Sequence, residues 1–292
     1  MARLTWDGSG QKKYQCGVDQ VVLYVGNKTG VTTTLDENHK FKSCVKREKT
    51  QGDLTIVDPT YKTGVAWNGI TAINESPTGG ETTTLYADNI AYCNITSAEK
   101  YAYSIEAYDY PDEFAVCDGV ATISVPGMTN NSDKPFMKVG QQSRRSFALC
   151  YRTQLGSDTS ELGEDYKINL VYGCKAAVSG KNHSTINESP DAGSMSWECS
   201  ATTQSFLTNA ATTAEEIKTA KVELQKSVFV GNSNKNKWNT TYEDIWNALN
   251  DILLGYGSGV GGASTSGDAY CMSPQNIYDF VNYFDPKKGF GS

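Results

Sequence analysis

Short strand-like segments separated by strong turn signals most constrain what this chain can fold into. Residues 64–118 hold three of them, at 65–73 (VAWNGITAI), 82–94 and 101–110 (YAYSIEAYDY). Asn68-Gly69 indicates a bend in the first, and in the third the residues at 101, 103, 105 and 107 share one apolar face. Between the first two, NESPTGG at 74–80 predicts a turn, because proline and paired glycines interrupt a strand ladder.

The same strand pattern continues along most of the chain. Further strands are predicted at 19–25, 120–125, 146–153, 166–174, 183–188 and 194–202. The segment 166–174 alternates in the manner of a half-buried strand. Turn signals recur about every ten residues, which favours a β-sandwich or barrel over alternating strands and helices.

Helical patterns are few and lie mostly near the C-terminus. Pro111 followed by two acidic residues predicts a short helix, since proline and acids suit a first turn. The composition changes near residue 205, which divides the chain into a β-domain at 1–204 and a helical C-terminal extension at 205–292. Within this extension helices are predicted at 213–224, where TAEE forms a capping box, at 242–254, and from 274 onward.

Charge and cysteine content restrict the partners and the setting. The net charge of −7 argues against a surface that grips nucleic-acid phosphates. The basic segment 39–49 (HKFKSCVKREK) is read as a solvated loop in preference to a phosphate-binding patch. Its eight cysteines form no Cys-x-x-Cys pair and are predicted to be reduced thiols. We expect no secretory signal in the N-terminal residues and no membrane span.

A search for chemistry finds no catalytic, cofactor-binding or metal-binding residues. The only histidines, His39 and His183, lack nearby ligands, and the GSGVGG segment at 257–262 follows a helix where a dinucleotide loop would follow a strand. The densest carboxylate cluster admits a calcium site or an acid/base pair, but the pattern favours a solvated helix start. It comprises Asp109, Asp112, Glu113 and Asp118.

The motif INESP occurs at 73–77 and again at 186–190. Two readings of this repeat are open: two catalytic loops, or two equivalent corners that end a strand with a proline turn. The second is favoured, because a proline turn commonly ends a strand and the enzyme reading has no positive support.

An ordered set of segments carries a resemblance to a known family. The segments are GVAWNGITAINESP (64–77), LYADNIAY (85–92), SAEKYAYSIEAYDYPDEFAVCDG (97–119), GQQSRRSFALCYRT (140–153), YKINLVYGCKA (166–176), TINESPDAGSMSWECSATT (185–203), ILLGYG (252–257) and SPQNIYDFVNYF (273–284). Together they resemble the major tail proteins, or tail-tube subunits, of long-tailed, non-contractile bacteriophages. The chain departs from the family's pattern at 206–239, which looks like an insertion, and in a lengthened Gly/Ser loop at 255–267.

The resemblance implies a mainly β fold: a tail-tube-type β-sandwich or barrel with a flanking short helix and the helical C-terminal extension. It implies a structural virion protein without enzymatic activity, found in the virion tail and in the host cytoplasm during assembly. Hexameric rings of such subunits stack into a tube, similar to that of type VI secretion systems, whose lumen conducts DNA. The implied partners are other copies of the chain and the tape-measure, tail-terminator and baseplate or tail-tip proteins.

Several features of the chain agree with that expectation. An acidic wall would let DNA slide, and strand pairing between subunits would satisfy open sheet edges. The polar loop 29–52 is a candidate for ring-to-ring contact. Two alternatives remain: a receptor- or carbohydrate-binding β-sandwich at the tail tip, suggested by the many tyrosines, and an acid/base hydrolase using Asp109 or Glu113.

Overall fold

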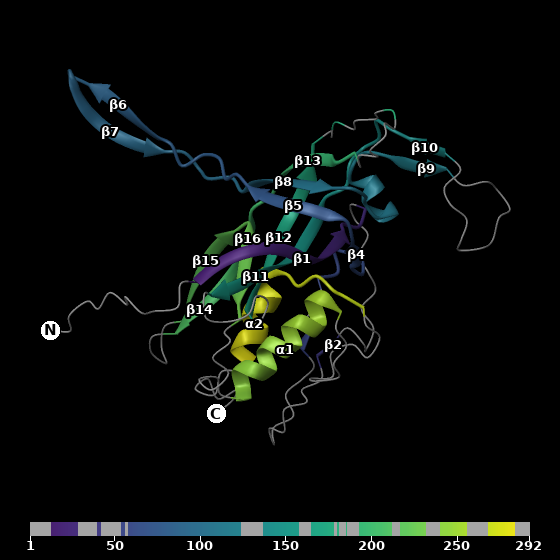
Figure 1. The fold of residues 1–292 in the computed structure, drawn as a ribbon. Helices are drawn as coiled ribbons and strands as arrows, with labels where there is room; N and C mark the ends of the chain where they lie inside the picture. Colours follow the sequence, from purple (N-terminus) through teal and green to yellow (C-terminus); the bar gives the residue numbers. More distant parts are fainter. Residues whose placement is uncertain are drawn as a thin grey trace.

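The computed structural model describes residues 13–28, 40–41, 54–55, 58–123, 137–157, 165–177, 180, 185, 193–211, 217–231, 240–255 and 268–283. These residues form a mainly β protein with an eight-stranded antiparallel sheet (Figure 1). Its strand order is β4-β1-β11-β12-β13-β8-β5, with β16 also paired to β12. The strands are β1 (Lys13–Val25), β4 (Val65–Trp67), β5 (Ile70–Glu75), β8 (Ala102–Ala107), β11 (Phe147–Ser157), β12 (Asp165–Ala176), β13 (Met195–Ser200) and β16 (Lys226–Val230).

Four two-stranded sheets and three helical segments complete the described fold. The small sheets are β2 (Lys40–Phe41) with β3 (Leu54–Thr55), β6 (Thr82–Ala87) with β7 (Ile90–Thr96), β9 (Ala121–Ile123) with β10 (Met137–Val139), and β14 (Gln204–Ala211) with β15 (Ile217–Leu224). The helical segments are a 3₁₀ helix at Asp112–Val116, α1 (Thr240–Leu254) and α2 (Pro274–Tyr283). Among the described residues, neither helix has the length and apolarity that a membrane crossing would need.

The centre of the sheet is buried on both of its faces. Along β1, Val22 and Tyr24 join one buried cluster while Leu23 joins the other. In β12, Ile168 and Leu170 likewise face the first cluster and Val171 the second. The predicted strand at 166–174 is therefore confirmed, but its half-buried character is wrong, because apolar residues on both sides of β12 are covered.

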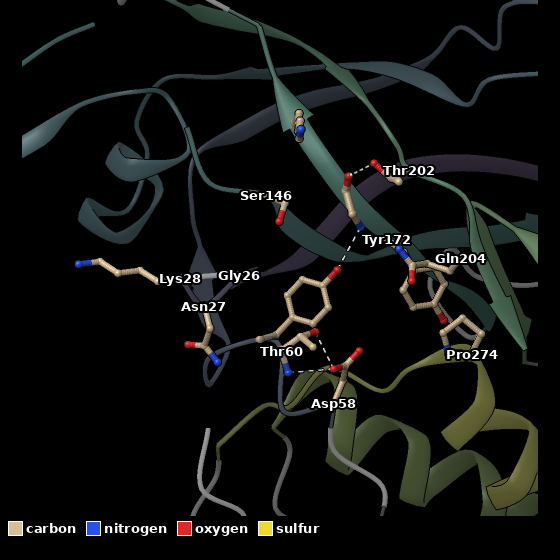
Figure 2. A pocket seen from close by; sticks show the side chains of 13 residues that line it. Gly26, Asn27, Lys28, Asp58, Thr60, Ser146, Tyr172, Thr202, Gln204 and Pro274 are labelled. Atoms are coloured by element: carbon tan, nitrogen blue, oxygen red, sulfur yellow. Dashed lines mark hydrogen bonds between the residues drawn. The ribbon is translucent and has the colours of Figure 1, made fainter. Parts of the chain in front are cut away.

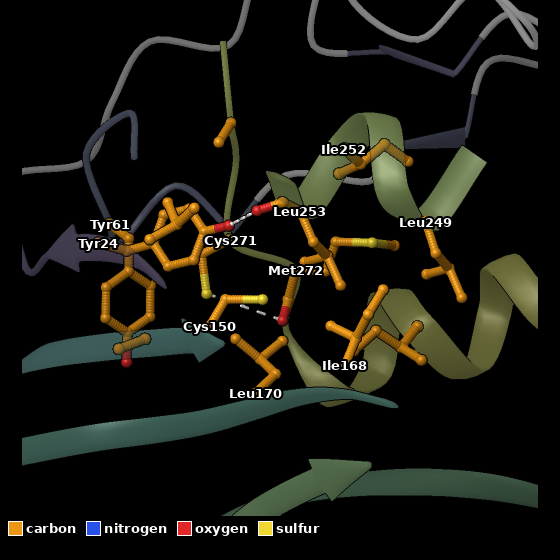
Figure 3. Close-up of a cluster of buried hydrophobic side chains, with 14 of the residues drawn as sticks. Tyr24, Tyr61, Cys150, Ile168, Leu170, Leu249, Ile252, Leu253, Cys271 and Met272 are labelled. Carbon is orange, nitrogen blue, oxygen red and sulfur yellow. Dashed lines mark hydrogen bonds between the residues drawn. The ribbon is translucent and has the colours of Figure 1, made fainter. Parts of the chain in front are cut away.

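Helices α1 and α2 cover the first face of the sheet (Figure 3). Leu249 and Ile252 of α1 pack with residues of β11 and β12, and the Tyr24 hydroxyl donates a hydrogen bond to the Leu253 carbonyl. Gly255 ends α1 with a φ of 71°, and the Ser273 hydroxyl caps α2 by accepting a bond from the Asn276 amide at 3.1 Å. The helices predicted at 242–254 and from 274 onward are thus confirmed.

Strands β5, β8 and β13 cover the opposite face. Although β5 lies at the far end of the strand order, it contacts β1, so the sheet curls over itself. The curled sheet does not close into a barrel, because β4 and β5 form no ladder with each other among the described residues. The alternation predicted for 101–110 is confirmed, since Tyr103, Ile105 and Ala107 are fully buried.

Aromatic packing between the two layers fixes the short helix after Pro111. Phe114 lies 4.4 Å from Trp67, 5.3 Å from Trp197 and 5.4 Å from Phe147, measured between ring centroids. The helix start predicted at Pro111 is confirmed as the 3₁₀ helix. The bend predicted at Asn68-Gly69 is confirmed too: it separates β4 from β5, and Gly69 has a φ of 86°.

The turn predicted at 74–80 is wrong, because the chain continues there as a two-stranded ribbon. The amides of Ser76 and Thr78 bond to the carbonyls of Ala102 and Lys100 at 2.8 and 2.9 Å. Inward-facing and outward-facing amides alternate along an antiparallel edge, so Pro77 occupies a position where no donor is needed. Gly79 and Gly80, at φ of 95° and 73°, redirect the ribbon without ending it.

The actual reversal lies in the middle of the strand predicted at 82–94. Asp88 and Asn89 have φ of 50° and 63°, the left-handed values that a tight two-residue hairpin turn requires. β6 and β7 therefore form a hairpin across this segment.

The helix predicted at 213–224 is also wrong. Residues Ile217–Leu224 form β15, which pairs antiparallel with β14 from Gln204↔Leu224 to Ala211↔Ile217. Its sequence IKTAKVEL includes three β-branched residues, and β14 supplies hydrogen bonds that a local helical pattern does not reveal. The capping box at 213–216 and the second INESP copy lie outside the described residues. The strand predicted at 183–188 also lies outside them, except for residue 185.

Candidate assembly interface

A long two-stranded arm, residues 76–100, projects from the body of the protein (Figure 1). It leaves at the end of β5 and returns at the start of β8, with β6 and β7 as its outer part. Twelve residues lie between Glu75 and Asp88, and at about 3.3 Å per residue they extend about 40 Å. Nearly all of the arm is exposed to solvent. The arm therefore contributes little buried area to the protein, and most of its surface is in contact with solvent.

The hairpin of the arm has one face that is polar at Thr82 and Thr84 and continues to Tyr86 near the turn, and one apolar face. On the polar face, Thr82 lies opposite Thr96 at 3.3 Å between hydroxyls, and the Thr84 hydroxyl donates to the Asn94 amide oxygen at 2.7 Å. The alternate cross-strand pairs make up the other face: Thr83 with Ile95, Leu85 with Cys93, and Ala87 with Ile90.

Large apolar side chains on the arm are strongly exposed. Leu85, Ile90 and Ile95 are 44%, 64% and 54% exposed, and Tyr86 and Tyr92 near the turn are 75% and 73% exposed. Asp88 is the only charged residue from 82 to 98. An uncharged strand pair with such a surface is prone to associate with other chains unless a partner covers it.

An ion pair surrounded by tyrosines holds the root of the arm. Lys226 of β16 pairs with Glu75, and the Tyr151 hydroxyl donates to the same carboxylate at 2.8 Å. The Lys226 ammonium also lies 5.3 Å from the ring centroid of Tyr101 and 5.4 Å from that of Tyr151. Burial raises the pKa of Glu75, but hydrogen bonds from Lys226 and Tyr151 outweigh it and hold this pKa below its ordinary value of 4.5.

A glutamine adds backbone contacts at the same root. The Gln225 side-chain oxygen accepts a hydrogen bond from the Tyr101 amide, and its side-chain nitrogen donates to the Glu99 carbonyl at 3.3 Å. Gln225, which links β15 to β16, and Lys226, the first residue of β16, thus hold both strands of the arm where they leave the body.

A groove of about 600 Å³ lies on the body (Figure 2). The segments around 26–28, 58–61 and 172–175 contribute to its walls, together with Ser146, Thr202, Gln204 and Pro274. Across one wall, the Tyr61 hydroxyl accepts a bond from the Gly173 amide at 3.1 Å, and the Thr202 hydroxyl donates to the Gly173 carbonyl at 2.9 Å.

The groove carries two lysines against one aspartate. The Asp58 carboxylate accepts hydrogen bonds from the amide and hydroxyl of Thr60, at 2.9 and 2.6 Å. Lys28 and Lys175 are exposed, and neither ammonium group pairs with a carboxylate within the part of the chain that the structure describes. The groove therefore favours a negatively charged group over a positively charged one.

Three strands of the large sheet have an edge that no described strand covers. β4 pairs only with β1, β5 only with β8, and β16 only with β12. On β16, Val228 and Val230 are 47% and 60% exposed. Such edges offer unpaired backbone donors and acceptors to a strand of another chain.

The carboxylates considered as a catalytic or calcium site have separate partners. Asp112 pairs with Lys138 at 2.9 Å, the Asp118 carboxylate accepts from the Trp197 indole at 3.1 Å, and Asp109 accepts from the neighbouring Tyr110 amide at 2.8 Å. Glu113 is exposed. Among the described residues, no group of three or more His, Cys, Asp or Glu side chains is placed to hold a metal ion.

Other predicted features have mixed outcomes. The described cysteines are free thiols: Cys16, Cys93, Cys117, Cys150, Cys174, Cys199 and Cys271. Several predicted features lie outside the described residues: both histidines, the segment 257–262, and the loop 29–52 with its basic stretch, apart from residues 40–41. Sequence reasoning missed the arm, although the absence of charge around Asp88 was a visible signal.

No family model matches the chain, and no curated protein matches it.

Proposed function

We propose that this chain is a structural subunit that assembles with copies of itself into a tube, as the major tail proteins of long-tailed phages do. The observation that carries the proposal is the exposed arm. An arm about 40 Å long, whose outer hairpin has an apolar face, is costly to leave in water and suits a contact between subunits.

The open strand edges supply the second kind of contact that a tube needs. In the proposed assembly, edges such as that of β16 pair between neighbours of a hexameric ring, so that a tail-tube-type β-sandwich completes its sheet with strands of the next subunit. The arm then links each subunit to a neighbour beyond the reach of its body. A chain with this role needs no catalytic residue, metal or cofactor.

Electron microscopy of the purified protein over a range of concentrations and salt tests the proposal. We expect stacked rings with sixfold symmetry and a central channel. A particle that stays monomeric under all conditions, in both sedimentation and microscopy, would contradict the proposal.

The second candidate is a binding protein at the tail tip. Exposed Tyr86 and Tyr92 favour it, because aromatic rings bind sugars. Aliphatic Leu85, Ile90 and Ile95 on the same arm suit a protein partner better. Quantifying the chain in purified virions separates the two, since a tube subunit is present in many copies and a tip protein in few.

A further inference from the structure

We propose that the tip of the arm, residues 86–92, docks into the groove at Lys28 and Lys175 of a second copy of this chain. This inference rests on the proposed self-assembly and names the two surfaces that meet. The arm leads away from the body that carries it, so the surface it serves belongs to another molecule (Figure 1).

Charge selects the groove as the receiving surface. Asp88 is the only charge on the outer arm, and the tight turn places it at the extreme end. The groove offers two lysines without a carboxylate partner among the described residues, while its own Asp58 is engaged by Thr60. Lysines without a carboxylate partner at the edge of the groove attract the single carboxylate of the arm tip, and this attraction favours one seating of the tip over others.

Shape and side-chain type agree with this pairing. The groove volume of about 600 Å³ is enough for the turn at Asp88 and Asn89, while the bulky side chains that flank the turn would lie along the rim of the groove. Tyr61, Tyr172 and Pro274 give the groove apolar walls, and Tyr86, Ile90 and Tyr92 beside the turn would cover them. Exposed tyrosines of this kind are typical anchors of protein interfaces.

The turn is already shaped for docking. Asp88 and Asn89 both have left-handed φ values, which the hairpin fixes before any contact forms. Little ordering is then required on binding, so the contact loses less entropy than one made by a loose loop.

Charge exchange with sedimentation velocity as the readout tests the contact. Asp88→Lys alone, or Lys28→Glu combined with Lys175→Glu, should each weaken self-association by about tenfold or more. The triple variant should recover most of that loss, because the attraction is restored with the signs exchanged. Glu113→Lys changes the net charge as Asp88→Lys does, at an exposed site on the 3₁₀ helix, and should leave association unchanged.

The proposal is overturned if Asp88→Lys associates as strongly as the unaltered protein, or if the triple variant associates no better than the weaker of the two variants that it combines. It is also overturned if Glu113→Lys weakens association as much as Asp88→Lys does. Folding of each variant is checked by its thermal midpoint, which should not move because both lysines and Asp88 are exposed.

Cross-linking provides an independent measurement. In a Cys93→Ser background, mixing Asp88→Cys with Lys175→Cys under mild oxidation should give a disulfide-linked pair that neither variant forms alone. Absence of that pair would overturn the contact. If Asp88→Lys forms normal rings, the proposed contact is rejected and the tube proposal stands. If the copies cross-link but never form rings, the contact stands and the tube proposal is rejected.

Discussion

At the scale of single residues, Gly79 controls the passage from body to arm. Its φ of 95° is a conformation that side chains rarely adopt, and a Cβ there would lie 2.3 Å from the Ala98 carbonyl oxygen. The ribbon can therefore bend at this point only with glycine.

We expect Gly79→Ala to destabilise the arm by about 1–2 kcal/mol or more while the body stays intact. Amide hydrogen exchange should be faster in β6 and β7 and unchanged in β11 and β12. Gly140→Ala is the control, because a Cβ there meets nothing within 4 Å. Unchanged exchange in the arm of Gly79→Ala would contradict this role.

The ion pair at the root of the arm predicts a dependence on pH. Because the pKa of Glu75 is lowered in the folded protein, its contribution is complete above the unfolded value near 4.5 and is lost as the pH falls through the folded value. Carboxyl NMR of the dissociated protein should give a Glu75 midpoint below 4.5, and Lys226→Met should raise it. A midpoint at or above 4.5 in the parent would show that the pair does not form.

Thiol reactivity gives a residue-scale test of burial and assembly together. Burial raises the pKa of the Cys117 and Cys174 thiols to about 12, so these groups should react with a thiol reagent only after unfolding. Cys93 is exposed on the apolar face of the arm and should react at once in the dissociated protein. In the assembled form Cys93 should be protected, and equal labelling of both forms would argue that the arm stays uncovered.

At the scale of elements, the arm is predicted to be dispensable for folding and required for assembly. Ser97 and Glu81 are bonded at 2.9 Å, so an Asn-Gly turn can join them in place of residues 82–96. The shortened chain should keep its thermal midpoint within about 2 °C, because the removed residues bury almost nothing. It should no longer form rings.

The two faces of the hairpin provide the matched control. Leu85→Asp with Ile95→Asp places charges on the apolar face, and Thr82→Asp with Thr96→Asp places the same number on the polar face. Assembly should fail in the first and persist in the second. Equal effects from both pairs would mean that the apolar face is not the contacting surface.

The local sequence pattern was sufficient to predict a strand or helix where the periodicity of apolar residues matches the face that is buried. The alternation from Tyr101 to Ala107 and the helix that ends at Gly255 were predicted, because each signal lies within the element itself. Residues 217–224 were not, because the partner strand that makes them a hairpin is supplied by 204–211. The arm was missed for a related reason, since Pro77 and Gly79 read as a turn unless the strand returning through Lys100 is known.

At the scale of the whole molecule, the two faces of the central sheet are covered by different elements. One face is covered by α1 and α2 and the other by the curled β13-β8-β5 branch, so the body has a core of its own. What it leaves uncovered are strand edges, a groove and the arm. Open strand edges were expected in general terms from the family resemblance, whereas the groove is formed by segments distant in sequence and has no local sequence signal.

Because the arm and the groove lie on different parts of one chain, an assembly built from them has a direction. One terminus of the polymer would display vacant grooves and the other unengaged arm tips. Two different capping chemistries follow: a cap for the first must carry an acidic turn, and a cap for the second must carry a basic recess. If one cap is in place before the other, the polymer would grow at a single terminus, the one that is still uncapped.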